Sequence, residues 1–244
     1  MEITSELSFD HEDRRRIYEY VERHGPTPKR ELRQSLGIDA GGLRHHLALL
    51  RRDGYISESG SRVEVAYDEG AIEEHRGQEV TFVVRQARQA DLSGLVGAIR
   101  QVAEEGTYIE AESVAAMLDH EQVLLRHNDV ESRIFFVATV EDEVVGWVHL
   151  HIPETEKLAH TAELTVGVVE GYRGQGIGSQ LLQRGVQWAG TNGYEKLYNS
   201  APATNDRAIA FLEEHGWTIE AVREDHYRIE GELVDEVMMA LSLT

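Results

Sequence analysis

Apolar side chains recur at helical spacing three times near the start of the chain. This periodicity predicts helices over residues 13–24, between residues 28 and 37, and over residues 40–53. The apolar positions are Ile17, Tyr20, Val21, Leu32, Leu36, Leu43, Leu47 and Leu50. Two short apolar runs within residues 55–65 then flank a Ser-Gly-Ser turn, which is typical of a hairpin. The amino-terminal part is therefore expected to form three helices and a two-stranded hairpin.

From Val80 onward the pattern changes to alternating strands and helices. Strands are predicted at residues 81–88, 133–140, 143–152, 160–169, 196–200, 217–228 and 234–241. Helices are predicted at residues 91–103, 114–118, 176–190 and 205–215. This alternation indicates an α/β domain with a mixed sheet. The polar, acidic segment Asp68–Glu79 has no periodicity and is expected to be a linker. We therefore expect a small domain over residues 1–70, a linker over 71–79 and an α/β domain over 80–244.

Composition narrows the class of protein. The 244 residues contain no cysteine, which excludes disulfides, thiolate zinc sites and a cysteine nucleophile. The longest apolar stretch, Ile134–Val140, is too short to span a bilayer, and the amino terminus lacks a signal-peptide pattern. These features predict a soluble, cytoplasmic protein.

The charge is strongly acidic but unevenly distributed. The chain has 24 basic and 44 acidic side chains, and only Lys29, Lys157 and Lys196 are lysines. An acidic surface with so little lysine is typical of halophilic proteins, and it predicts a haloarchaeal source. Residues 12–62, in contrast, carry 11 basic and 8 acidic side chains. A locally basic segment in an acidic chain indicates a contact with an anionic partner.

The stretch His11–Tyr67, including LRHHLALLRRDGYI, resembles a winged helix-turn-helix domain. The resemblance implies that the third helix enters the major groove of double-stranded DNA and that the wing touches its backbone. The side chains expected on the outward face of this helix and on the wing are Arg44, His45, His46, Arg51, Arg52 and Arg62. The alternative is that the arginines form a solvated face and that the module docks proteins or dimerises. Adjacent histidines make a poor metal pair, so no metal is expected there.

A glycine-rich turn in Leu164–Leu182 indicates anion binding. A predicted strand leads into glycines at positions 174, 176 and 178, and an amphipathic helix follows. Glycines let backbone N–H groups approach an anion, and the helix start adds positive charge. The turn lacks the Gly-Lys-Ser/Thr of a Walker loop and the first-βαβ setting of a dinucleotide fingerprint. The pattern therefore suits a pyrophosphate without matching either common motif.

The run Arg173–Gly178 resembles the R/Q-x-x-G-x-G/A motif of the GNAT acetyltransferase superfamily. Residues 205–217 resemble a second GNAT segment, with Asn205, Ala208 and Trp217 at matching positions. The resemblance implies the GNAT fold, a mixed and mostly antiparallel sheet with flanking helices, and acetyl-CoA as cosubstrate. It implies that pyrophosphate is held by the backbone amides of Arg173, Gly174, Gln175, Gly176, Ile177, Gly178 and Ser179. Pantetheine would pair with Val166 and Val168, and Asn205 and Ala208 would line its far side. Asn205 also suits a helix N-cap.

The implied chemistry is acetyl transfer to an amine by direct attack in a ternary complex. Glu163 resembles the position of a general base in some family members, and the alternative is that it merely faces solvent. The Val168 N–H would meet the developing oxyanion. Leu212 stands where the family often has a tyrosine acid, which leaves Tyr198, His226 and Tyr227 as replacements. His149, His151 and His160 could share a sheet face, but they more often line a cleft, and no metal is expected.

Three functions remain open from the sequence. The first is an N-acetyltransferase fused to a DNA-binding module. The second is a transcriptional regulator in which a catalytically weak GNAT domain senses acetyl-CoA or another ligand. The third is an acetyltransferase whose amino-terminal module binds protein. The sequence identifies neither the acceptor amine nor the DNA site, and it leaves a homodimer open.

Overall fold

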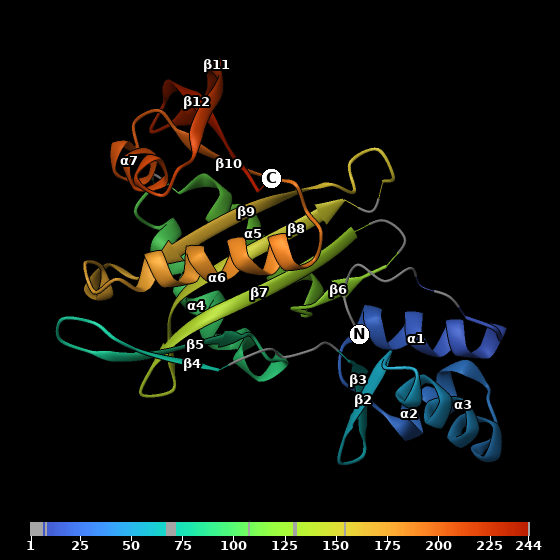
Figure 1. Ribbon diagram of the computed structural model, residues 1–244. Coiled ribbons are helices and arrows are strands. Elements are labelled where there is room, and N and C mark those ends of the chain that lie inside the picture. The colour runs from blue at the N-terminus through green and yellow to red at the C-terminus, as the bar shows by residue number, and fades with distance from the viewer. Residues whose placement is uncertain are drawn as a thin grey trace.

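The computed structural model describes residue 7 and residues 9–66, 72–106, 108–128, 131–153 and 155–243 (Figure 1). The first domain confirms the expected three helices and hairpin. Its elements are α1 (Glu12–His24), β1 (Thr27–Pro28), α2 (Lys29–Leu36), α3 (Ala40–Arg52), β2 (Ile56–Ser59) and β3 (Arg62–Val65). The two-residue strand β1 pairs with β3 and gives the sheet order β1-β3-β2. This is the winged-helix arrangement expected from the sequence.

Individual residues set the start of α3 and the end of α2. Asp39 caps α3 because its carboxylate accepts hydrogen bonds from the Gly41 and Gly42 amides. Gly37 ends α2 in the left-handed conformation, with φ of 67°. Apolar side chains from all three helices and the hairpin then form one core.

The second domain is built on one mixed sheet. Its strands are β4 (Glu73–Arg76), β5 (Thr81–Gln86), β6 (Arg126–His127), β7 (Glu131–Val140), β8 (Glu143–Pro153), β9 (Thr161–Val168), β10 (Lys196–Pro202), β11 (Thr218–Ile229) and β12 (Glu232–Ser242). The order is β11-β12-β10-β9-β8-β7-β5-β4, with β6 paired to β7. Within the described strands of this sheet, only β9 and β10 pair in parallel. The expected mixed, mostly antiparallel sheet is therefore confirmed.

Helices cover both faces of this sheet (Figure 1). They are α4 (Leu92–Ala103), α5 (Ile109–Glu121), α6 (Ile177–Thr191) and α7 (Asp206–Glu214), with short 3₁₀ turns at Gln89–Asp91 and Glu170–Tyr172. α6 packs on one face over a core that includes Leu164 and Leu181, and α4 and α5 pack on the other face around Trp147. Gly167 is required on this second face, because a Cβ there would lie 2.3 Å from the Trp147 ring.

The segment expected to be a linker contributes one strand to the sheet. β4 pairs antiparallel with β5, and Glu73 forms an ion pair with Arg184 on α6 at 3.4 Å. After the strand, Gly77 approaches the Gln175 carbonyl so closely that a Cβ would lie 2.8 Å from it. The sequence Glu-Glu-His-Arg hides this strand, because an edge strand needs no apolar alternation. The expected linker over residues 71–79 is thus wrong for residues 73–76, while residues 67–71 lie outside the described part.

The two domains touch through α1 and β6. The Tyr18 hydroxyl donates to the His127 carbonyl at 3.0 Å. Glu22 accepts from Arg126 at 3.3 Å and from Asn128 at 3.0 Å. Tyr18 and Glu22 are 1% and 5% exposed, so this contact is buried. The amino-terminal domain therefore does not hang on a free tether.

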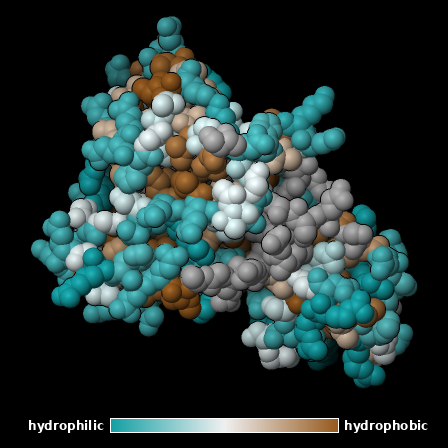
Figure 2. Space-filling model, viewed as in Figure 1, coloured by the Kyte–Doolittle hydropathy of each residue, from teal (hydrophilic) through white to brown (hydrophobic). Residues whose placement is uncertain are grey.

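The surface in the view of Figure 2 is mostly hydrophilic. A hydrophobic group lies at the top, where β11 and β12 lie in Figure 1, and Ile219, Val222 and Leu233 of this hairpin are about half exposed. No helix in the described part of the chain combines the length and the hydrophobicity that crossing a bilayer requires.

Candidate active site

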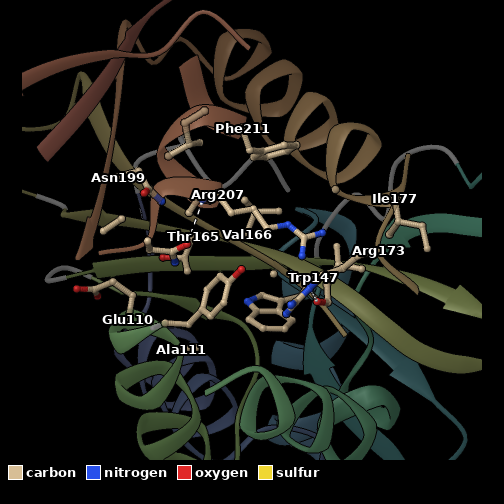
Figure 3. A pocket seen from close by; sticks show the side chains of 18 of the residues that line it. Glu110, Ala111, Trp147, Thr165, Val166, Arg173, Ile177, Asn199, Arg207 and Phe211 are labelled. Atoms are coloured by element: carbon tan, nitrogen blue, oxygen red, sulfur yellow. Dashed lines mark hydrogen bonds between the residues drawn. The ribbon is translucent and has the colours of Figure 1, made fainter. Parts of the chain in front are cut away.

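A cavity lies where β9 and β10 separate. Residues 161–163 of β9 pair with residues 196–198 of β10. Beyond this short paired stretch, the Asn199 side chain bridges the two strands by donating a hydrogen bond to the Leu164 carbonyl at 2.5 Å. The gap opens into a cavity of about 340 Å³. Figure 3 shows it between the green helix that carries Glu110 and Ala111 and the orange helix that carries Arg207 and Phe211.

One edge of β9 is left without a strand partner at this cavity. The carbonyls of Leu164 and Val168 accept from the Asn199 and Arg173 side chains, so they point away from β8. Backbone groups of alternate residues point to the same edge of a strand, which places those of Val166 on the open side as well. An extended ligand could pair with this edge like an added strand.

The glycine-rich turn forms the end of the cavity beside α6. Gly174 and Gly176 have φ of 78° and 84°, values that strain any other residue, and a Cβ at either would meet no atom within 4 Å. α6 begins after Gly176 without a side-chain cap. Its first amides have no carbonyl partner within the helix and are available to an anion. The turn therefore fits a pyrophosphate.

Most of the residues expected to bind the cosubstrate line this one cavity. They are Val166, Val168, Arg173, Gly174, Gly176, Ile177, Gly178, Ser179, Asn205 and Ala208. Gln175 does not, because its side chain turns to the β4–β5 connection and accepts from the Glu79 amide at 2.8 Å. Asn205 caps α7 by accepting from the Ala208 amide at 3.1 Å. Its interpretation as an N-cap is confirmed.

Arg173 lines the cavity, but both its amide and its guanidinium form hydrogen bonds within the protein. Its amide donates to the Glu170 carbonyl at 3.1 Å, so this amide is not free for an anion as expected. Its guanidinium binds Glu105 with two hydrogen bonds of 2.8 and 2.5 Å and lies 5.5 Å from the Tyr108 ring centroid. Although burial opposes it, the bond to Glu105 raises the pKa of Arg173. Arg207, which the sequence did not single out, is an exposed cation on the cavity wall.

Glu110 is the acidic side chain that lines the cavity among the described residues, and sequence reasoning missed it. Burial and then the charges of Glu163 and Glu236 raise its pKa. Glu163 is exposed and does not line the cavity. It lies opposite His151 on β8 and Tyr198 on β10. The arrangement places a carboxyl group of raised pKa at the cavity and a second carboxylate beside it.

The expected replacements for the missing tyrosine are placed differently from one another. Leu212 is buried at 2% exposure and lines the cavity. Tyr198 and His226 do not line it. The Tyr227 hydroxyl donates to Glu236 at 3.1 Å, and burial first and then the Glu236 charge raise the pKa of Tyr227 to about 12. Tyr108 and Tyr172, which the sequence did not suggest, do line the cavity.

The histidines considered for a metal in the second domain do not gather. His149 is 6% exposed, stacks on Phe135 with ring centroids 4.4 Å apart, and burial lowers its pKa well below the usual value. His151 instead lies 3.6 Å from Glu131, and His160 is exposed.

The face of α3 expected to bind DNA is accessible, with one correction. Arg44, His45, Arg51 and Arg52 on α3 and Arg62 on the wing are all exposed. His46 is only 8% exposed, and its placement on the outward face was wrong. It lies three residues after Leu43, which puts it on the buried face of the helix.

Comparisons with known proteins agree with both domains. Residues 98–217 match the acetyltransferase (GNAT) family, and residues 14–57 match a winged helix-turn-helix DNA-binding family. A mycothiol acetyltransferase of Corynebacterium efficiens is 34% identical over 80 residues, which is 32% of this chain and 25% of that protein. The one of Jonesia denitrificans is 30% identical over 129 residues, 48% of this chain and 40% of that protein. The chain thus spans less than half the length of these curated relatives.

Solved structures share the fold of the second domain. A GNAT-family acetyltransferase from Streptococcus pneumoniae is 21% identical with a TM-score of 0.56, over 67% of this chain and 99% of that one. A Salmonella typhimurium protein solved with its cofactor acetyl-CoA is 19% identical with a TM-score of 0.54, over 67% of this chain and 94% of that one. The cavity beside β9, the uncapped start of α6 and the family match lead to one conclusion: the chain carries an acetyltransferase domain of the GNAT family behind an amino-terminal winged helix-turn-helix domain.

Proposed function

We propose that this chain is an acetyl-CoA-dependent N-acetyltransferase whose acceptor is an amine, carried either by a small molecule or by a protein. We also propose that it binds double-stranded DNA through its winged-helix domain. One observation carries the enzymatic part. A carboxyl group of raised pKa, Glu110, lines the same cavity as the uncapped amides at the start of α6. A sensor of acetyl-CoA would need only the amides.

The cosubstrate would lie along the open edge of β9. The backbone amides from Gly174 to Ser179 that face the cavity would hold its pyrophosphate, and the exposed Arg207 would add a positive charge. The pantetheine arm would pair with Val166 and Val168. When bound, acetyl-CoA supplies an acetyl group activated as a thioester. Asn205 would support this site by fixing the start of α7.

The reaction needs an amine without its extra proton. Glu110 is proposed to accept that proton, because it lines the cavity and its raised pKa makes its carboxylate a stronger base. Glu163, the base expected from the sequence, is proposed to act on Glu110 through its negative charge. The Val168 N–H lies on the open edge of β9 and would donate to the developing oxyanion. Tyr108 and Tyr172 are nearer candidates for protonating the departing thiolate than Tyr198 or His226, since they line the cavity.

The test of the enzymatic proposal is acetyl-CoA turnover against a panel of amines with a free-thiol readout. The wild-type chain should turn over with at least one amine, and Glu110→Gln should lose about 10²- to 10⁴-fold in rate. Calorimetry of both chains with acetyl-CoA separates the two hypotheses. Binding without turnover over the whole panel would favour the ligand-sensing regulator instead.

DNA binding is proposed on the exposed arginines of α3 and the wing. Contacts with phosphates release counterions, so affinity should fall steeply as salt rises. Duplex DNA from the region upstream of the gene, titrated at several salt concentrations, provides the test. Arg51→Ala with Arg52→Ala should make the slope of log K against log salt shallower by about 2. No affinity for DNA at any salt concentration would favour a protein-docking module.

The lack of cysteine suits a reducing compartment, and the cytoplasm is the proposed location.

A further inference from the structure

A second group of titratable side chains lies in the winged-helix domain, outside the cavity. His11 stands at the N-cap of α1, Asp13 lies in its first turn, and His46 lies on α3. One nitrogen or oxygen atom from each lies within 4.8 Å of those of the other two. We propose that His11, Asp13 and His46 bind a divalent transition-metal ion, with Zn²⁺ as the best match to two imidazoles and one carboxylate.

The three groups lie close to the spacing that one small ion requires. Asp13 Oδ2 lies 3.9 Å from His11 Nδ1 and 3.8 Å from His46 Nε2. Bonds of about 2.0–2.2 Å in a tetrahedral site place two ligand atoms about 3.3–3.6 Å apart, so the three groups would move slightly closer on binding. The ring centroids of the two imidazoles are 4.6 Å apart, and their ligand atoms lie within 4.8 Å of each other. Three protein ligands and a water would complete a four-coordinate site.

The ring nitrogens are in a form that can bind a metal. His11 Nδ1 accepts the Asp13 N–H at 3.0 Å, so it carries a lone pair rather than a proton. Binding the ion would exchange this helix-capping bond for a metal bond. His46 is 8% exposed, its Nδ1 has no hydrogen bond within the described part of the chain, and its Nε2 lies 3.8 Å from Asp13 Oδ2. A neutral imidazole binds a metal through one ring nitrogen, and Nε2 is the nitrogen of His46 that lies near the Asp13 carboxylate.

The neighbouring charges orient the carboxylate. Asp13 Oδ1 accepts from Arg16 at 3.1 Å, which leaves Oδ2 directed at the two histidines. Burial lowers the pKa of His46, while the Asp13 carboxylate opposes this effect. Arg14 also acts against a cation here, but its Nη1 turns to Asp10 at 3.5 Å.

An ion at this site would connect the start of α1 to the recognition helix α3. The two helices already pack through the domain core, and the metal would add a cross-link at one end of it. Because the ion binds the folded arrangement and not the unfolded chain, occupancy should stabilise the domain.

The experiment uses the full chain, stripped with a chelator and titrated with Zn²⁺ by calorimetry and with Co²⁺ by visible absorption. We expect one ion per chain, a four-coordinate Co²⁺ spectrum and a higher melting temperature with Zn²⁺. His46→Gln and Asp13→Asn should each weaken Zn²⁺ binding at least tenfold. His24→Gln, an exposed histidine at the other end of α1, is the matched control and should bind as the wild type does.

Asp13→Asn keeps the shape of the side chain, so it tests the site even where His46→Gln disturbs the core. Circular dichroism of each variant identifies any loss of fold. The proposal is overturned if the wild-type chain binds no stoichiometric Zn²⁺, or if folded Asp13→Asn and His46→Gln bind it with unchanged affinity.

Discussion

At the scale of single residues, the cavity brings together groups that the sequence separates widely. Glu110 comes from α5, Val168 from β9 and Gly176 from the turn before α6. The carboxylate is the proposed proton acceptor, the strand edge offers an N–H, and the turn offers uncapped amides. Their roles are different, so changes at each should affect different measurements.

The two neighbouring glutamates should differ in how they shape the pH profile. If Glu110 is the base, as proposed, the acid limb of kcat/KM should follow its raised pKa, because the protonated carboxyl group cannot accept a proton. Glu163→Gln removes a like charge, so it should lower that pKa and move the acid limb to lower pH while activity is kept. Rates measured across pH 5–9 provide the check. A large loss in Glu163→Gln with little change in Glu110→Gln would reverse the two roles.

The glycine turn should control cosubstrate affinity. Gly176→Glu adds a side chain where φ is 84° and places a negative charge beside the amides, so acetyl-CoA binding should fall by at least about 100-fold. Gly190→Glu is the matched control, because it lies at the other end of α6 with no atom within 4 Å of an added Cβ. Calorimetry with acetyl-CoA distinguishes them. Equal affinity of both variants would remove the turn from the binding site.

At the scale of elements, the sequence predicted regular, apolar segments and missed short, polar ones. The three helices of the first domain and, apart from β6, the order of strands and helices from β5 to β12 follow from periodicity, and the structure confirms them. β1, β4 and β6 have between two and four residues and little apolar content, so no period could appear. α5 was expected only from Val114, because its start at Ile109 has no capping side chain.

That missed helix start explains why the site was predicted only in part. The glycine turn and Asn205 carry local motifs, and they could be found without a structure. Glu110 lies in the first turn of α5 and reaches the cavity only through the packing of α5 against the sheet. Its raised pKa comes from burial and from residues on β9 and β12. No spacing within the chain encodes such a meeting.

The edge strand β4 should matter for the stability of the second domain. Two truncated chains, residues 72–244 and 80–244, both lack the winged helix and differ in β4 and its connection to β5. The shorter chain exposes the edge of β5, so it should melt at a lower temperature and aggregate more readily. Thermal unfolding and light scattering of the two provide the comparison. Identical melting curves would mean that β4 adds nothing to the stability of the second domain and that the domain boundary predicted at residue 80 is adequate.

At the scale of the whole molecule, charge has two distinct uses. The net charge of −20 and the rarity of lysine still predict a halophilic protein, which stability measured against KCl concentration would test. A homodimer also stays a prediction.

A few buried charges join the domains. Glu22 pairs with Arg126 at 3.3 Å, Arg126 with Glu121 at 3.0 Å, and Glu121 with the fully buried Arg133 at 2.6 Å.

Removing the first charge of this series should loosen the domains from each other. Glu22→Gln leaves Arg126 partly unpaired in a buried contact, which should lower the free energy of unfolding by about 1–3 kcal/mol. Glu19→Gln, on the exposed side of α1, is the control and should change it by less than about 0.5 kcal/mol. Urea unfolding measures both. Equal stability of the two variants would show that the ion pair is not needed for docking.

The carboxylate of Glu22 also has a consequence for how this chain can be recombined. Winged-helix domains are often regarded as interchangeable modules, but here the docking charge sits on the same helix that builds the domain core, one residue after the buried Val21. A domain grafted from another protein would have to supply an acid at this helical position, or else strand Arg126 against an apolar surface. Likewise, any acetyltransferase domain placed behind this winged helix would have to supply a basic side chain at the position of Arg126. The two halves are therefore compatible as a matched pair, and a chimera that respects only the sequence boundary should express poorly until both partners of the ion pair are transferred together.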